Sequence, residues 1–328
     1  MKRILLPFWN SDDRRLRAGW RLILHVILVA FLIVALEVLL SLASEDLEDS
    51  SAFGIVEMAL SGLAIVAGTL LAARFLDRRP VSDLGLQFSS HWWRDLGYGL
   101  FLGAFLMLLV FLVELALGWA TVEEIFLTNR SVPFGLAIFW PLTLYLAVGI
   151  YEELVSRGYH FKNLAEGLSF SPLGRRSAIL LAWLISSAVF GLLHAGNPNA
   201  TVVSTVNLFL AGLFLGLPFL LTDQLAMPIG IHITWNFFQG NVFGFPVSGT
   251  SNNETTFIAV QQGGPDLWTG GAFGPEAGLL GLAAILVGSL LIVWWVKRTR
   301  GAVGFELAVA EYQSPASSES VAGTPPVE

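Results

Sequence analysis

The sequence is poor in charge and lacks cysteine altogether: Lys, Arg, Asp and Glu make up 13% of its 328 residues. The absence of cysteine excludes disulfides, thiolate catalysis and metal sites built on cysteine. Soluble proteins carry roughly 25% charged residues, so this chain has too few for a soluble domain. It also lacks a basic stripe that would bind nucleic acid, so no nucleic-acid partner is expected. Any chemistry must therefore use Glu, His, Asn, Arg or hydroxyl side chains.

Apolar residues fill most of the chain instead, with 55% hydrophobic residues and a mean hydropathy of +0.69. A bilayer core about 30 Å thick needs roughly 20 apolar residues per helix. Runs of this kind predict an all-α fold: a polytopic transmembrane bundle of about eight helices, in one domain over 19–300. The seventh run is short and the fourth is unusually long. The eight runs cover residues 19–43, 52–76, 96–117, 133–165, 177–195, 200–222, 225–240 and 274–296.

Lys and Arg gather in alternate loops, as expected when basic residues stay on the cytoplasmic side. This alternation predicts both termini in the cytoplasm, with a basic segment over 1–18 and a flexible tail over 301–328. We therefore expect a multi-pass plasma-membrane protein whose surroundings are the lipid bilayer. The basic loops contain Lys2, Arg3, Arg14, Arg15, Arg17 and Arg21; Arg74, Arg78, Arg79 and Arg94; Arg175 and Arg176; and Lys297, Arg298 and Arg300.

Ionisable residues inside transmembrane runs are costly and mark candidate functional sites. Glu37, Glu57 and Glu114 stand alone in the first three runs, and we interpret them as structural, near a helix end or paired inside the bundle. The remaining candidates fall in a narrow stretch of the second half of the chain. They are Glu152, Glu153, Arg157, His194, His232 and Asn236.

Helical spacing separates the two adjacent carboxylates. Glu153 and Arg157 stand at i and i+4, where they can pair on one face, while Glu152 points about 100° away. One acid can then be held ionised and structural while Glu152 faces a cavity and acts on water. The alternative is a simple ion pair at a helix end.

The histidines complete a possible hydrolytic set. His194 closes the fifth run, and His232 and Asn236 share one helical face in the seventh. A Glu with a His can polarise water, and a second His with an Asn can donate to a developing oxyanion. Zn²⁺ bound by Glu152, His194 and His232 is an open alternative, although no His-Glu-x-x-His is present. His232 lies only about 10 Å from the expected helix start at Leu225, so that helix must tilt or begin deeper.

Three motifs occur in order: Glu152-Glu153-x-x-x-Arg157-Gly158, Phe190-x-x-x-His194 and His232-x-x-x-Asn236. Over residues 140–240 they resemble the CPBP family of intramembrane proteases, which includes type II CAAX prenyl endopeptidases and bacteriocin-immunity proteins. Outside this core, only Leu84-Gly85-Leu86 resembles the family, and loop 241–272 is individual to this chain.

The resemblance implies an eight-helix bundle whose active site opens toward the cytoplasm. Glu152 would activate water with His194, Glu153 and Arg157 would support the site, and His232 and Asn236 would stabilise the oxyanion. Both a metal-dependent and a metal-free glutamate mechanism are attributed to the family.

The leading hypothesis is an intramembrane endopeptidase that hydrolyses a membrane-associated protein or peptide, with a prenylated CAAX-type protein as one candidate substrate. A non-catalytic scaffold or immunity partner on the same fold is the first alternative. A solute or proton-coupled transporter is the second, although the chain shows no inverted repeat.

Overall fold

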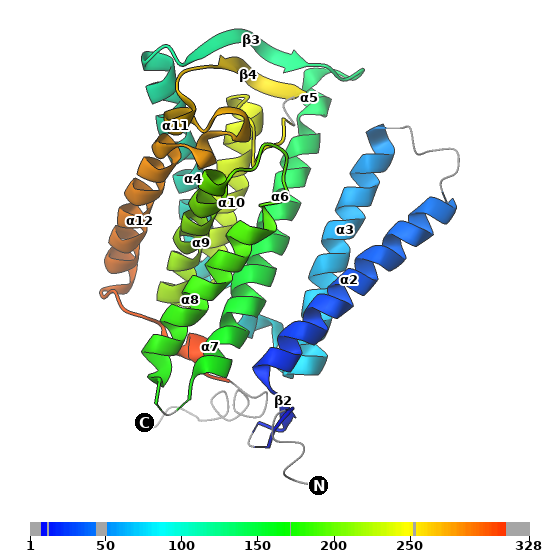
Figure 1. The fold of residues 1–328 in the computed structure, drawn as a ribbon, viewed down its shortest axis with the longest axis vertical. Coiled ribbons are helices and arrows are strands. Elements are labelled where there is room, and N and C mark those ends of the chain that lie inside the picture. The colour runs from blue at the N-terminus through cyan, green and yellow to red at the C-terminus, as the bar shows by residue number, and fades with distance from the viewer. Residues whose placement is uncertain (1–7, 12, 44–50, 171, 252–253, 313–328) are drawn as a thin grey trace.

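The computed structural model describes residues 8–11, 13–43, 51–170, 172–251 and 254–312. Within these residues, seven helices are long and apolar enough to cross a membrane, and they form one bundle (Figure 1). The predicted polytopic helical fold is confirmed. The predicted seventh helix is present as the shorter α10, which lies inside the bundle.

The helices follow the apolar runs closely. The long fourth run is a continuous helical stretch over Phe134–Leu168, in which a π-helical segment, η3, joins α6 to α7. The helices are α2 (Ala18–Ala43), α3 (Ser51–Ala72), α4 (Ser90–Ala116), α5 (Phe134–Ala137), α6 (Phe139–Glu153), η3 (Leu154–Phe161), α7 (Lys162–Leu168), α8 (Gly174–Leu193), α9 (Val202–Thr222), α10 (Ala226–Phe237), α11 (Asp266–Thr269) and α12 (Leu279–Arg300).

Two helix starts differ from the expected residues for local reasons. α4 begins six residues early because the Ser89 hydroxyl accepts a hydrogen bond from the Trp92 amide at 3.2 Å and caps the helix. α12 begins five residues late. Gly274 has a φ of 104°, which favours glycine, and the short 3₁₀ turn η6 (Pro275–Ala277) follows it before the helix starts.

The turn between α9 and α10 lies inside the protein. Lys162 Nζ donates to both Asp223 carboxylate oxygens, at 3.0 and 2.9 Å, which fixes this turn beside the start of α7. The Leu225 amide donates to the carbonyl of Gly85 at 3.0 Å. α10 therefore begins inside the bundle and not at its end. This explains how His232, only about 10 Å from the helix start at Leu225, can reach the depth of the other candidate residues.

Glycines let α10 pack directly against α4. A Cβ on Gly103 would lie 2.4 Å from Thr234 Oγ1, and one on Gly99 would lie 2.5 Å from the Met227 carbonyl. Gly230 on α10 faces the α4 backbone in the same way. Small residues at such contacts allow close approach of helices in membranes. The helix that carries His232 is thus held by backbone-to-backbone packing.

A two-stranded antiparallel sheet covers one end of the bundle, here called the sheet end (Figure 1). Strand β3 (Ala120–Thr128) pairs with β4 (Thr255–Gln262), although they are far apart in the sequence. Gln262 Nε2 donates to both carboxylate oxygens of the fully buried Glu114. Glu114 therefore holds the sheet onto α4, in line with its structural interpretation, whereas Glu57 is partly buried and Glu37 is exposed.

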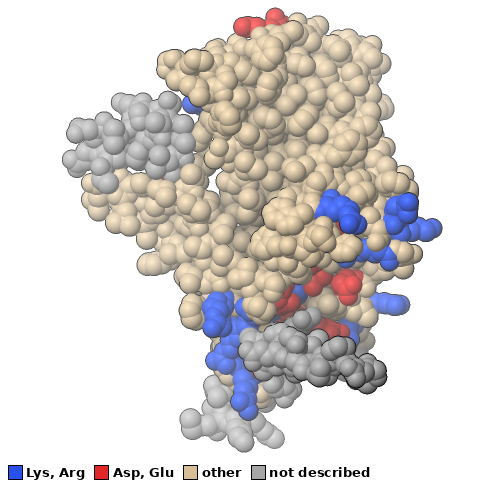
Figure 2. Space-filling model, turned by 180° about the vertical axis from the view of Figure 1, so that it is seen from behind, with Lys and Arg blue, Asp and Glu red and all other residues tan. Residues whose placement is uncertain are grey.

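The opposite end, here called the basic end, carries most of the Lys and Arg side chains (Figure 2). The short strands β1 (Trp9–Asn10) and β2 (Arg15–Leu16) lie there (Figure 1). Its exposed cations are Arg14, Arg17, Arg74, Arg78, Arg94, Arg175, Arg176, Lys297, Arg298 and Arg300.

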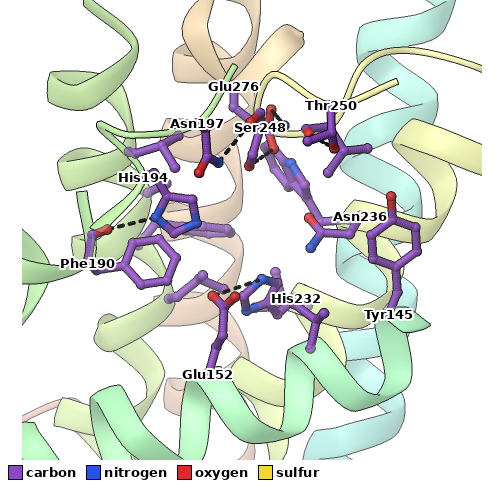
Figure 3. Close-up of a pocket in the computed structure, with 18 of the residues that line it drawn as sticks. Tyr145, Glu152, Phe190, His194, Asn197, His232, Asn236, Ser248, Thr250 and Glu276 are labelled. Atoms are coloured by element: carbon purple, nitrogen blue, oxygen red, sulfur yellow. Dashed lines mark hydrogen bonds and ion pairs between the residues drawn. The ribbon is translucent and has the colours of Figure 1, made fainter. Parts of the chain in front are cut away.

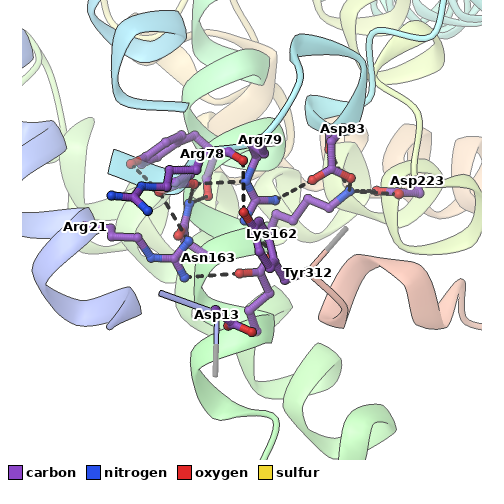
Figure 4. A network of polar contacts seen from close by, with 12 residues as sticks. Asp13, Arg21, Arg78, Arg79, Asp83, Lys162, Asn163, Asp223 and Tyr312 are labelled. Carbon is purple, nitrogen blue, oxygen red and sulfur yellow. Dashed lines mark hydrogen bonds and ion pairs between the residues drawn. The ribbon is translucent and has the colours of Figure 1, made fainter. Parts of the chain in front are cut away.

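Beneath this surface lies a buried ion-pair network (Figure 4). Glu166 pairs with Arg15 and Arg21 at 2.9 and 3.1 Å, and with Arg79. Arg79 also contacts Asp77 and Asp83 at 3.1 and 2.9 Å. We expected Arg15, Arg21 and Arg79 to be loop cations, yet all three are buried. Burial of charges requires such matched partners, so the network joins β2, α2, the segment that follows α3 and α7 at this end.

The segment after α12 packs back onto the bundle. The Glu306 amide donates to the Leu220 carbonyl at 3.0 Å, and Val309 is fully buried. The Arg15 guanidinium lies 3.4 Å from the centre of the Tyr312 ring. Residues 305–312 of the segment expected to be a flexible tail therefore pack against the bundle, and residues 301–304 are exposed. The rest of that prediction lies outside the described residues.

Candidate active site

A cavity of about 200 Å³ lies between α6, α8, α9 and α10 (Figure 3). Most of its lining is apolar, and its few polar side chains point toward one another. Glu152, His194, His232 and Asn236, all candidates from the sequence, line this cavity. Tyr145, Asn197, Ser248, Thr250 and Glu276 complete the polar lining.

The two adjacent glutamates have different surroundings. Glu153 is fully buried, and its Oε1 accepts from Arg157 Nη1 at 2.8 Å, so the predicted pair is present. Arg157 also donates to the Gly212 carbonyl at 2.9 Å. Glu152, with 24% of its side chain exposed, faces the cavity. Glu153 and Arg157 therefore support the wall, and Glu152 is the accessible acid.

The local helix geometry helps to separate these roles. α6 ends at Glu153, and the chain continues as the π-helical segment η3, which contains Arg157. Single π-helical turns are frequent at functional sites because they reorient side chains within a helix. The Arg157 guanidinium here also lies 4.7 Å from the centre of the Phe190 ring, below His194. The segment thus links α6 to both α8 and α9.

His232 joins the two glutamates. Its Nδ1 lies 2.7 Å from Glu153 Oε1, and its Nε2 lies 3.9 Å from Glu152 Oε2. An ionised carboxylate can only accept, so Nδ1 carries a proton and donates to Glu153. Orientation of one imidazole nitrogen by a carboxylate fixes the direction in which the other points. Nε2 is thereby aimed at the cavity.

His194 is oriented by the backbone of its own helix. Its Nδ1 lies 2.8 Å from the Phe190 carbonyl oxygen, which can only accept a hydrogen bond. Nδ1 is therefore the protonated nitrogen of the neutral ring, and Nε2 carries the lone pair. That lone pair can accept a proton or hold a water molecule on the cavity side.

Asn236 and Tyr145 place further polar groups on the cavity wall. Asn236 lies one turn beyond His232 on α10, as the i, i+4 spacing predicted (Figure 3). Tyr145 was not among the candidates, although it lies seven residues, about two helical turns, before Glu152. Because seven residues are about two helical turns, the spacing could have predicted that Tyr145 shares the helix face of Glu152.

Glu276 is a second residue that sequence reasoning missed. It accepts from the Ser248 amide at 2.9 Å and from the Ser248 hydroxyl at 3.1 Å. Asn197 Nδ2 in turn donates to the Ser248 carbonyl at 2.9 Å. Burial raises the pKa of Glu276, against the lowering effect of the Ser248 hydrogen bonds. No sequence signal identified it, because it stands inside the apolar run expected to be the eighth helix.

The zinc alternative requires Glu152, His194 and His232 to converge. Among the described residues, no group of three His, Asp or Glu side chains is arranged to hold a metal ion. His232 Nδ1 donates to Glu153, so only its Nε2, 3.9 Å from Glu152 Oε2, could bind an ion. The side chains as placed do not fit a zinc site.

The cavity is displaced toward the sheet end. On α8 it is lined by Phe190 and His194, at the end nearer the sheet, and on α6 by Leu144, Tyr145, Val148 and Glu152, which run from the sheet-end half of the continuous stretch Phe134–Leu168 to its middle. The described chain ends lie at the basic end (Figure 1). The loop residues of the cavity lining and the described chain ends therefore lie toward opposite ends of the bundle.

Comparison with known proteins gives one match. Residues 134–238, which run from α5 into η4 (Phe238–Val242) and include the six candidate residues, match the family described as type II CAAX prenyl endopeptidase Rce1-like. This agrees with the resemblance drawn from the three motifs. No curated protein and no solved structure matches the chain.

Proposed function

We propose that this chain, which carries an Rce1-like type II CAAX prenyl endopeptidase domain at residues 134–238, is an intramembrane endopeptidase that activates water with Glu152. The observation that carries the proposal is the division between two neighbouring acids. Glu153 is buried against Arg157 and His232, while Glu152 faces a cavity that also contains His194 and Asn236. Its substrate is a membrane-associated protein or peptide, and its location is the plasma membrane.

In this mechanism a water molecule lies between the Glu152 carboxylate and His194 Nε2. Glu152 takes a proton from the water as its oxygen attacks the carbonyl carbon of the scissile bond. The negative charge that develops on the carbonyl oxygen is stabilised by hydrogen bonds from Asn236 Nδ2 and from Nε2–H of a doubly protonated His232, whose Nδ1–H still donates to Glu153. Glu152 then returns the proton to the leaving nitrogen as the C–N bond breaks, which completes the hydrolysis.

The supporting residues determine where these groups point. Glu153 receives hydrogen bonds from both Arg157 and His232 on one oxygen, at 2.8 and 2.7 Å. Arg157 is itself anchored on the α9 backbone. This chain of contacts orients His232 without placing either Glu153 or Arg157 in contact with substrate.

Cleavage of a fluorogenic peptide library, prenylated and unprenylated, tests the proposal with purified wild type, Glu152→Gln and Glu114→Gln. Gln keeps the size of the side chain but cannot act as a base. We expect Glu152→Gln to abolish cleavage while it stays folded. Glu114→Gln, a buried membrane carboxyl outside the cavity, should retain activity. A chelator arm separates a glutamate mechanism from a metal mechanism.

Two other functions predict different results in the same assay. A scaffold or immunity partner should show no cleavage by folded wild type, and Glu152→Gln should keep its cellular function. A transporter should move solute or protons in proteoliposomes in a manner that depends on Glu152. The buried Glu153–Arg157–His232 contacts suit a scaffold equally well, so the accessible Glu152 is the residue that distinguishes these functions.

A further inference from the structure

The first observation concerns which parts of the helices line the cavity. α8 begins with Gly174 at the basic end, and His194 follows its last residue; the 20 residues of the helix correspond to about 30 Å. That distance is close to the whole thickness of a bilayer core. Beyond His194, the lining continues through Asn197, Ser248 and Glu276 in the loops of the sheet end. The cavity thus runs from Glu152 away from the basic end.

The second observation is that the path from Glu152 to the basic end is closed. Glu153 and Arg157 are buried directly beneath Glu152. The fully buried rings of Phe161 and Phe219 lie 5.5 Å apart below them. Lys162, also fully buried, then contacts Asp83 and Asp223 at 2.9 Å. Among the described residues, packed rings and matched charges fill this path.

The third observation is that accessible positions open the cavity on the other side. Leu144, Val148 and Glu152 are partly exposed and follow one another at four-residue intervals on one face of α6. His194 and Asn197, across the cavity, are also partly exposed. A polypeptide in the bilayer can therefore reach Glu152 beside α6, from the half of the membrane nearer the sheet end.

The fourth observation is the charge difference between the two ends. Arg130 is the one Lys or Arg among the described residues of the sheet end, whereas the exposed cations gather at the basic end (Figure 2). Lys and Arg in short loops remain on the cytoplasmic side of a membrane. The basic end is thereby assigned to the cytoplasm and the sheet end to the opposite face.

We infer that the active site is reached from the non-cytoplasmic half of the membrane, so its substrates are membrane-anchored polypeptides whose scissile bond lies on the non-cytoplasmic side. This inference rests on the proposed peptidase function. It replaces the expectation of a site that opens to the cytoplasm. A cytoplasmic chain end, as a CAAX-type substrate would present, faces the closed basic end.

Cysteine labelling of the full-length protein in intact cells tests the orientation. The chain has no cysteine, so wild type provides a clean background. Ser131→Cys and Ala302→Cys introduce one thiol each at exposed positions of the sheet end and the basic end. We expect a membrane-impermeant maleimide to label Ser131→Cys in intact cells and Ala302→Cys only after permeabilisation. The reverse pattern would overturn the inference.

Activity is measured separately, so that failure of the two proposals can be distinguished. Both cysteine variants are assayed in detergent with the peptide library, where orientation has no effect. A peptide cleaved there is then fused to a single transmembrane helix, on either its cytoplasmic or its non-cytoplasmic side. We expect Glu152-dependent cleavage of the non-cytoplasmic fusion alone. Cleavage of the cytoplasmic fusion alone contradicts the inference but leaves the peptidase function standing.

Discussion

At the basic end, Glu166 lies against the side chains of Arg15, Arg21 and Arg79, while Glu152 in the cavity lies 3.9 Å from His232. Among the described residues, Glu152 has no ion pair with Lys or Arg. The side chains of both carboxylates are mostly shielded from water, with 5% of Glu166 and 24% of Glu152 exposed, and exclusion of water makes an unmatched charge costly. This difference indicates two roles for buried charge. The ion-pair network around Glu166 stabilises the fold, whereas in the cavity an acid and two imidazoles are available for chemistry.

After Glu152 itself, the largest effect on turnover is expected from His194, across the cavity from it. His194→Ala removes the Nε2 lone pair that holds the attacking water for Glu152, and loss of a side chain that takes part in general acid–base catalysis typically slows a reaction by about 10²–10⁴-fold. We expect a fall of that size in kcat with little change in Tm. His91→Ala, at an exposed position on α4, is the matched control and should keep wild-type kcat. Equal activity of the two variants would remove His194 from the mechanism.

A smaller effect is expected from the packing that positions His232. A Cβ on Gly103 would lie 2.5 Å from the Ile231 carbonyl, whereas one on Gly97 of the same helix would meet nothing within 4 Å. Gly103→Val should destabilise the protein by about 1–3 kcal/mol and lower peptidase activity, because α10 must move. Gly97→Val should change neither. Unfolding in denaturant and peptide cleavage provide both readouts, and unchanged values for Gly103→Val would contradict the packing argument.

The smallest effect concerns Glu276. Because burial raises its pKa above the ordinary value of 4.5, its contribution to stability is fully present below that value. The contribution is lost as the pH rises through the raised pKa, since the buried carboxyl must then ionise. Glu276→Gln cannot ionise, so its Tm should fall less than that of wild type between pH 5 and pH 9. Parallel Tm curves would show that Glu276 ionises without cost.

The sequence predicted the membrane helices and most of the candidate site because both depend on local spacing. Apolar runs of about 20 residues define the helices, and i, i+4 spacing places Arg157 beside Glu153 and Asn236 on the face of His232. These relations hold along one helix whatever the tertiary structure. These local relations were sufficient to separate Glu152, which faces the cavity, from Glu153, which supports the cavity wall.

What could not be predicted depends on contacts between distant segments. Arg79 and Glu166 are 87 residues apart, and neither position alone distinguishes a buried pair from an exposed charge. The same applies to the pairing of β3 with β4 and to the contact of Glu276 with Ser248. The depth of α10 depends on the contact between Lys162 and Asp223. Each of these features requires the folded arrangement of the helices.

The proposed division between a structural Glu166 and a catalytic Glu152 is tested most directly by one experiment. Tm and peptide turnover are both measured for Glu152→Gln and Glu166→Gln. We predict that Glu152→Gln keeps its Tm and loses turnover, because its carboxylate acts on water. Glu166→Gln should lose about 3–5 kcal/mol of stability, since it leaves buried arginines without their charge partner, while its folded fraction keeps turnover. Turnover retained by Glu152→Gln, or a fall in its Tm as large as that of Glu166→Gln, would contradict the account.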